Sequence, residues 1–169
     1  MFADQLPGAA LATALVANNE AGTINDAAEL ASSAAQALVP LHLDAVSALG
    51  HLPLSFRGLR GDAPDALGLV AMSVAGHKIG APVGVGALVV ARTARLSALL
   101  RGGAQQRGLR AGTQDVAGAA AFATALELAE SERESETTRL AAMRDRLVDG
   151  ILTLSLIHIS EPTRQAEIS

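Results

Sequence analysis

Three polar groups in this sequence each follow an apolar stretch and could take part in chemistry. Asn18 ends the stretch 11–18, Asp44 follows 41–43, and the pair His77-Lys78 follows 66–74. If these stretches are parallel strands, their carboxyl ends lie at one edge of a sheet, where α/β proteins bind ligands. The set would then place an amide, a carboxylate, an imidazole and an amine around one ligand.

A lysine combined with a carboxylate suits pyridoxal phosphate (PLP). The amine of Lys78 could hold the cofactor as a Schiff base. The carboxylate of Asp44 could keep the pyridine nitrogen protonated, so that the ring withdraws electrons from a substrate carbanion. Single lysines and aspartates are common at strand ends and turns. The PLP hypothesis therefore depends on the whole set of residues.

Two other patterns predict no further ligand site. The glycine-rich segment 80–86 (GAPVGVG) matches neither of the common phosphate-binding glycine motifs and precedes a strand, so a tight turn with close backbone approach is expected. His42, His51 and His77 do not share metal-ligand spacing, and no carboxylate cluster accompanies them, which argues against a zinc site.

The elements that would position these residues alternate between strand and helix. Asn25 or Asp26 offers an N-cap, and a helical pattern of apolar residues follows until Pro40 stops it; its members are Ala27, Leu30, Ala31, Ala34 and Leu38. Strands are predicted at 11–18, 41–44, 66–74 and 85–91. This order predicts the α/β class, with a mainly parallel sheet and flanking helices.

The second half of the chain reads as a loop, a long helix and a tail. Residues 101–113 (RGGAQQRGLRAGT) are rich in glycine and predict a loop. A helix is expected from Asp115 to about Asp149, with the charged stretch 130–139 facing solvent. The last residues, 153–169, share no periodicity with that helix and are similar to translated cloning adapters; a disordered natural tail is the alternative. They are left out of the predicted domain, 1–152.

Composition excludes several classes of protein. The net charge is −4 without a basic stripe, so we expect no nucleic-acid partner. The apolar run 9–17 is too short for a membrane helix and follows Asp4 rather than a basic segment, so a cytoplasmic protein is expected. Half of the residues, 50%, are hydrophobic, which suggests apolar surface awaiting cover by another segment or subunit. The chain has no cysteine and can supply no thiol nucleophile.

Four segments, in order, resemble the cysteine desulfurases among the class V, fold-type-I PLP enzymes. Residues 18–23 (NNEAGT) resemble the family's N-N-E-x-G segment, and 42–45 (HLDA) resemble H-x-D-A. Residues 76–78 (GHK) resemble the cofactor-lysine segment, and 102–113 resemble the loop G-G-G-x-E-R-G-x-R-x-G-T. The resemblance covers 1 to about 152 and implies part of a large PLP-binding domain.

The resemblance implies a role for each matching residue. Asn18 would contact the cofactor's phenolic oxygen or the substrate, Asp44 the pyridine nitrogen, and His77 would flank the site. Lys78 would carry the cofactor and move the substrate α-proton, and Thr113 would reach the cofactor phosphate of a partner subunit in a homodimer. L-Cysteine would be the substrate, and a sulfur acceptor or scaffold protein the partner, in iron–sulfur cluster or thio-cofactor assembly.

The chain also departs from the family pattern. Ser47 stands where the family usually has Gln beside the cofactor oxygen, and Ala75 where it has a phosphate-binding Ser; Ala104 and Gln106 replace Gly and Glu. Losing a hydrogen bond to a charged group costs about 1.5–3 kcal/mol, which would weaken cofactor binding. The persulfide-forming cysteine is absent, so we expect the isolated chain to be a poor or inactive desulfurase. A selenocysteine lyase, a class V aminotransferase and a non-catalytic PLP-fold module remain alternatives.

Overall fold

The structure is a computed structural model that describes residues 2–153. The predicted tail, 153–169, therefore lies outside the described residues except for Thr153. The chain divides into two compact units, Met1–Glu130 and Ser131–Ser169, and each is described by itself. All of the strands among residues 2–153 and every predicted site residue belong to the first unit.

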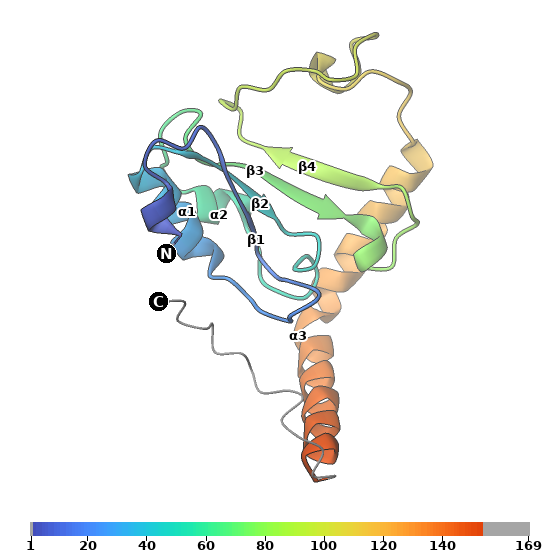
Figure 1. The fold of residues 1–169 in the computed structure, drawn as a ribbon. Coiled ribbons are helices and arrows are strands. Elements are labelled where there is room, and N and C mark those ends of the chain that lie inside the picture. Colours follow the sequence, from blue (N-terminus) through green and yellow to red (C-terminus); the bar gives the residue numbers. More distant parts are fainter. Residues whose placement is uncertain (1, 154–169) are drawn as a thin grey trace. The chain divides into compact units, whose positions relative to one another are not determined.

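One four-stranded sheet organises the first unit (Figure 1). Its strands are β1 (Ala12–Leu15), β2 (Pro40–Asp44), β3 (Gly68–Ala75) and β4 (Gly86–Val90), arranged in that order. β1, β2 and β3 are parallel, and β4 runs antiparallel to β3. The predicted mainly parallel α/β sheet is confirmed. β4 reverses direction because the connection from β3 is too short for the crossover that a parallel strand needs.

The remaining elements are short apart from two helices. They are η1 (Ala3–Gln5), α1 (Ala27–Gln36), α2 (Phe56–Arg60), η2 (Gly76–Lys78), η3 (Gln105–Gly108) and α3 (Val116–Thr153). Asp26 is the N-cap of α1, and its Oδ1 accepts hydrogen bonds from the backbone N–H groups of Ala28 at 2.9 Å and Glu29 at 3.0 Å. This satisfies two donors of the first turn.

The predicted end of α1 at Pro40 is wrong. The helix ends at Gln36, and Leu38 has a φ of 56°, in the left-handed region that a helix cannot continue through. Leu38 is 58% exposed, so it does not belong to the buried stripe that the helical pattern assigned it to. Pro40 instead opens β2, where a first-residue proline is tolerated.

The hydrophobic core lies between α1 and one face of the sheet. Leu41, Leu43 and Leu69 have no exposed surface, and they pack in one cluster with Ala31 and Ala34 of α1. Burying side chains of this size stabilises the fold by about 1.5–3 kcal/mol each. The alternation of half-buried and buried residues along β2 shows that its second face is not covered in the same way.

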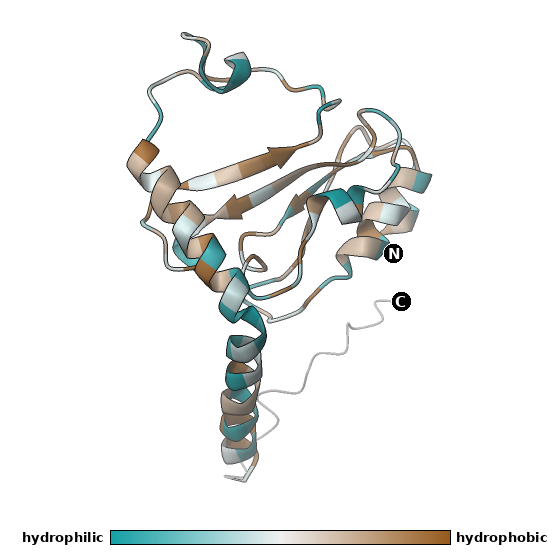
Figure 2. Ribbon diagram, turned by 180° about the vertical axis from the view of Figure 1, so that it is seen from behind, coloured by the Kyte–Doolittle hydropathy of each residue, from teal (hydrophilic) through white to brown (hydrophobic). Residues whose placement is uncertain are grey.

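β4 exposes apolar side chains. Leu88 is 52% exposed and Val89, its neighbour on the opposite face, is 36% exposed. In Figure 2 this strand is brown, hydrophobic, over part of its length. The expectation that the chain exposes apolar surface is therefore confirmed.

α3 starts where the sequence predicts and ends slightly later. Asp115 precedes the helix, and its Oδ1 accepts a hydrogen bond from the N–H of Gly118 at 2.9 Å. Phe122, in the part of α3 that belongs to the first unit, packs against the hydrophobic core. Among residues 2–153, no helix combines the length and apolar character required to cross a membrane.

Candidate functional site

The register of the parallel strands places the predicted site residues at one edge of the sheet. Leu15 of β1 lies opposite Asp44 of β2, and Asp44 lies opposite Ser73 of β3. The three strands therefore end at nearly the same level. Asn18 and the His77-Lys78 pair follow the ends of β1 and β3. They therefore lie at the same edge of the sheet as Asp44, as the sequence predicts for parallel strands.

Asn18 is held in a tight turn after β1. Its Oδ1 accepts hydrogen bonds from the N–H groups of Glu20 at 2.8 Å and Ala21 at 3.0 Å. The backbone of the same loop closes on itself, because Asn18 N–H donates to Thr23 O at 2.9 Å. Among the described residues, no side chain or carbonyl accepts from the Nδ2 group of Asn18. Its orientation is fixed while its amide donors are available to a ligand.

Asp44 is the last residue of β2 and is half-buried. Its Oδ1 accepts a hydrogen bond from Val46 N–H at 2.9 Å, which fixes the carboxylate against the turn that follows. Its Oδ2 has no hydrogen-bond partner among the described residues. Ser47 lies in that same turn and is also half-buried. A carboxylate held by one oxygen can present the other to a cationic N–H group.

Residues 76–78, which resemble the family's cofactor-lysine segment, form one turn of 3-10 helix, η2, directly after β3. Its first residue, Gly76, is buried, and its N–H donates to Val85 O at 2.9 Å. A Cβ there would lie 2.9 Å from the Ala81 methyl, 3.0 Å from Val85 Cγ1 and 3.2 Å from the ring of Phe122. Only glycine fits this packing, so Gly76 fixes where the chain turns. His77 and Lys78 are exposed on that turn.

The glycine-rich segment 80–86 is a turn that leads into β4, as predicted. Gly86 approaches the backbone of β3 so closely that a Cβ would lie 2.7 Å from Val74 O. The segment therefore returns the chain to the sheet and fixes the position of the chain directly after η2.

Thr113 lies in the segment between β4 and α3, whereas the other predicted site residues lie at or just after the ends of the three parallel strands. β4 runs antiparallel to β3 and carries the chain toward the opposite end of the sheet, and segment 91–115 then arches back to the start of α3 (Figure 1). Thr113 is exposed in that segment. The adjacent backbone is fixed by glutamine side chains, because Gly112 N–H donates to Gln105 Oε1 at 3.3 Å and Gln114 Nε2 donates to Gly112 O at 2.9 Å.

Sequence reasoning missed a hydrogen-bonded group next to the strand ends. The Nδ1 atom of His42 lies 2.9 Å from Thr13 Oγ1, and its Nε2 atom lies 3.1 Å from Ser73 Oγ. One imidazole thus links β1, β2 and β3. The signal available in the sequence was a polar residue within each of three otherwise apolar strands.

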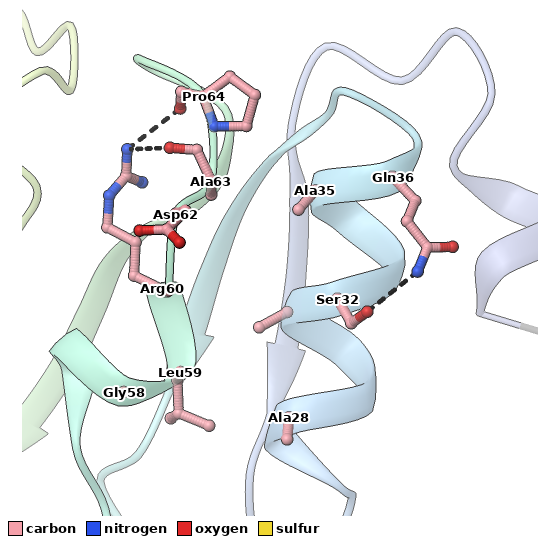
Figure 3. Close-up of a pocket in the computed structure, with 12 residues that line it drawn as sticks. Ala28, Ser32, Ala35, Gln36, Gly58, Leu59, Arg60, Asp62, Ala63 and Pro64 are labelled. Carbon is pink, nitrogen blue, oxygen red and sulfur yellow. Dashed lines mark hydrogen bonds between the residues drawn. The ribbon is translucent and has the colours of Figure 1, made fainter.

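A pocket of about 480 Å³ lies between α1 and the segment around α2, and it contains none of the predicted site residues (Figure 3). Small side chains of α1 form one wall, and Arg60 lies on the other. The Arg60 guanidinium donates to the carbonyls of Leu67 at 3.1 Å and Leu69 at 2.6 Å, at the start of β3. It also donates to the carbonyls of Ala63 and Pro64. This pocket therefore lies at the opposite end of β3 from Lys78.

The comparison with known families decides the identity of the fold. The family described as Aminotransferase class-V matches residues 4–169. This chain belongs to the class V aminotransferase family. Members of this family are PLP-dependent enzymes. The described residues are chemically suited to PLP, because a lysine amine, a carboxylate with one oxygen that lacks a partner and an amide donor lie at one edge of the sheet.

Curated proteins similar to this chain include cysteine desulfurases. The chain is 48% identical over 143 residues to an IscS-like cysteine desulfurase of Mycobacterium tuberculosis, a match that covers 85% of the chain and 34% of that protein. It is 44% identical over 146 residues to a cysteine desulfurase of Gluconacetobacter diazotrophicus, covering 86% of the chain and 34% of the relative. The class V chain thus spans about a third of the length of these relatives.

Solved structures agree with this class V assignment. A NifS-like protein superposes with a TM-score of 0.82 at 29% identity, covering 90% of the chain and 40% of the other protein. The NifS-like protein of Rickettsia africae gives a TM-score of 0.77 at 26% identity, over 85% of this chain and 38% of that one. The four-stranded sheet and its helices are therefore part of a larger fold in these neighbours.

Proposed function

We propose that this chain is part of the large PLP-binding domain of a cysteine desulfurase. The parent reaction would convert L-cysteine to L-alanine and pass the sulfur to an acceptor or scaffold protein for iron–sulfur cluster or thio-cofactor assembly. The similarity to the desulfurases of Mycobacterium tuberculosis and Gluconacetobacter diazotrophicus supports this choice. Because the chain spans 34% of each of those proteins, the activity belongs to the longer protein.

The observation that carries the proposal is the alignment of the strand ends. Leu15, Asp44 and Ser73 lie at one level in three parallel strands, and the chain then presents Asn18, Asp44 and Lys78 at that edge. Asp44 Oδ2 and Asn18 Nδ2 have no partner among the described residues, whereas their companion atoms Oδ1 are both hydrogen-bonded. Side chains fixed on one side and open on the other are suited to holding a ligand.

Each residue would have a distinct task around the cofactor. PLP bound there would supply an electron-withdrawing ring. Asp44 would accept a hydrogen bond from its ring nitrogen, and Asn18 would donate to the phenolic oxygen or the substrate. Lys78 would carry the cofactor and move a proton at the substrate α-carbon, with His77 flanking it. Ser47, in the turn after Asp44, has a shorter side chain than the residue usual in the family and would give a weaker contact.

The assembly that we infer is a cytoplasmic homodimer. Thr113 is exposed in the segment between β4 and α3, which is compatible with a contact to a partner subunit's cofactor. No thiol is present in the 169 residues to receive sulfur. We therefore expect the isolated chain to convert L-cysteine to alanine poorly or not at all, even in the presence of PLP.

Reduction with borohydride tests PLP binding directly. Lys78 is the only lysine of the chain, so the Schiff base has one side-chain amine to form on. The purified chain is mixed with PLP, reduced and digested, and the mass of the peptide that contains Lys78 is measured. We expect a stable pyridoxyl adduct on that peptide. Its absence, or an adduct confined to the N-terminal amine, would contradict the proposed site.

A further inference from the structure

The imidazole of His42 bonds to hydroxyl groups on both neighbouring strands. The distances are 2.9 Å from Nδ1 to Thr13 Oγ1 and 3.1 Å from Nε2 to Ser73 Oγ. A neutral imidazole has one donor and one acceptor nitrogen, and a hydroxyl can serve as partner to either. Both ring nitrogens are therefore satisfied, and one side chain spans the three parallel strands.

This group lies on the same face of the sheet as Asp44. Residues alternate between faces along a strand, and in β2 the buried Leu41 and Leu43 face the core beneath α1. His42 and Asp44 consequently share the opposite face. Thr13 lies opposite His42, and Ser73 lies opposite Asp44. The imidazole thus contacts the register partner of the candidate cofactor ligand.

The pairing of β2 with β3 is irregular at this point. Leu41 lies opposite Leu69, but His42 lies opposite Ala71, so β3 carries one additional residue there. A strand displaced by a single residue turns its side chains to the other face. The register after this irregularity therefore decides whether Ser73 or a core residue lies beside Asp44, and it sets the distance along β3 from Asp44 to Lys78.

We propose that His42 is a positioning residue that fixes this register. By bonding Ser73 beyond the irregularity and Thr13 on the other side, it holds Asp44 level with the ends of β1 and β3. Two backbone bonds depend on the same alignment: Val16 N–H to Asp44 O at 2.8 Å, and Ala45 N–H to Ser73 O at 2.9 Å. The effect on cofactor binding rests on the proposed function, whereas the effect on the strands does not.

Hydrogen exchange without PLP tests the effect on the strands. In His42→Ala, exchange of the Val16 and Ala45 amides should accelerate about tenfold, while the Leu30 amide in α1 should change less than twofold. Thr13→Val and Ser73→Ala should each give part of the effect. His51→Ala is the matched control, because His51 is exposed and its ring makes no hydrogen bond among the described residues. The proposal would be overturned if exchange of the Val16, Ala45 and Leu30 amides accelerated equally in His42→Ala and in Thr13→Val, or if exchange of none of these amides accelerated.

PLP titration with the same variants tests the effect on the site. His42→Ala should raise the Kd about five- to tenfold. His42→Gln keeps one donor and one acceptor and should restore binding to within about twofold. Unchanged affinity in His42→Ala, together with normal exchange, refutes the positioning role. If the wild-type chain fails to bind PLP, the proposed function fails, and the exchange rates alone decide whether His42 fixes the register.

Discussion

The polar groups near the two ends of β3 differ in how completely they are hydrogen-bonded within the chain. At the start of the strand, Arg60 donates to carbonyl groups of its own chain, including those of Leu67 and Leu69. At the other end, Asn18 and Asp44 each leave one polar atom without a partner among the described residues, and Lys78 is exposed. The guanidinium group of Arg60 is thus hydrogen-bonded within the chain. The side chains at the other end are positioned by the fold, but some of their polar atoms have no partner among the described residues.

This contrast separates a structural polar residue from a ligand-binding one. Buried or half-buried polar groups are normally paired, and an arginine that bonds several carbonyls stabilises the segment it spans. Open atoms on otherwise fixed side chains instead fit a site that a ligand completes. The pocket beside Arg60 is thus part of the stabilising end of the sheet, although it is concave (Figure 3).

The largest effect is expected from Lys78→Arg, which keeps the charge but removes the amine. Because Lys78 is the only lysine, the borohydride-fixed adduct should disappear completely. Lys78 is exposed, so the thermal unfolding temperature should stay within about 1 °C of the wild-type value. Mass spectrometry and a thermal scan measure the two quantities. An adduct that persists on the 76–78 peptide would show that the chemistry does not depend on this amine.

Arg60→Ala should act on stability alone. The substitution leaves several carbonyls at the start of β3 without their donor and should lower the free energy of unfolding by about 2–3 kcal/mol. Urea denaturation measures this loss. In Arg57→Ala, the control on the same helix, the change should be below about 0.5 kcal/mol because Arg57 is exposed. PLP fixation by folded Arg60→Ala that falls as far as in Lys78→Arg would remove the distinction between the two ends.

Asp44→Asn should act on the cofactor more than on the fold. The amide oxygen can still accept from Val46 N–H, so the turn is retained, but the negative charge opposite a cationic ring nitrogen is lost. We expect the Kd for PLP to rise about tenfold, equivalent to about 1.4 kcal/mol. Titration followed by absorbance measures it. Unaltered PLP affinity in a folded Asp44→Asn protein would exclude Asp44 as the ring-nitrogen partner.

Local sequence determined the elements and most of the candidate site. Apolar stretches before Asp44 and before Gly76 predicted β2 and β3 within a few residues, because short buried strands are recognisable from continuous apolar runs. The cap at Asp26 fixed the start of α1 for a local reason as well. The end of α1 was not predictable in this way, since Leu38 adopts its left-handed conformation in the tight connection between α1 and β2.

The residues and their order therefore identified Asn18, Asp44, His77 and Lys78 as a set, from chemistry and motif spacing alone. Only the tertiary structure decided how they are aligned. The irregularity beside His42 and the alignment of Leu15, Asp44 and Ser73 both arise from pairing between strands that are distant in sequence. Such pairing depends on register, and register is set by contacts between strands. The sequence pattern of one strand does not specify these contacts.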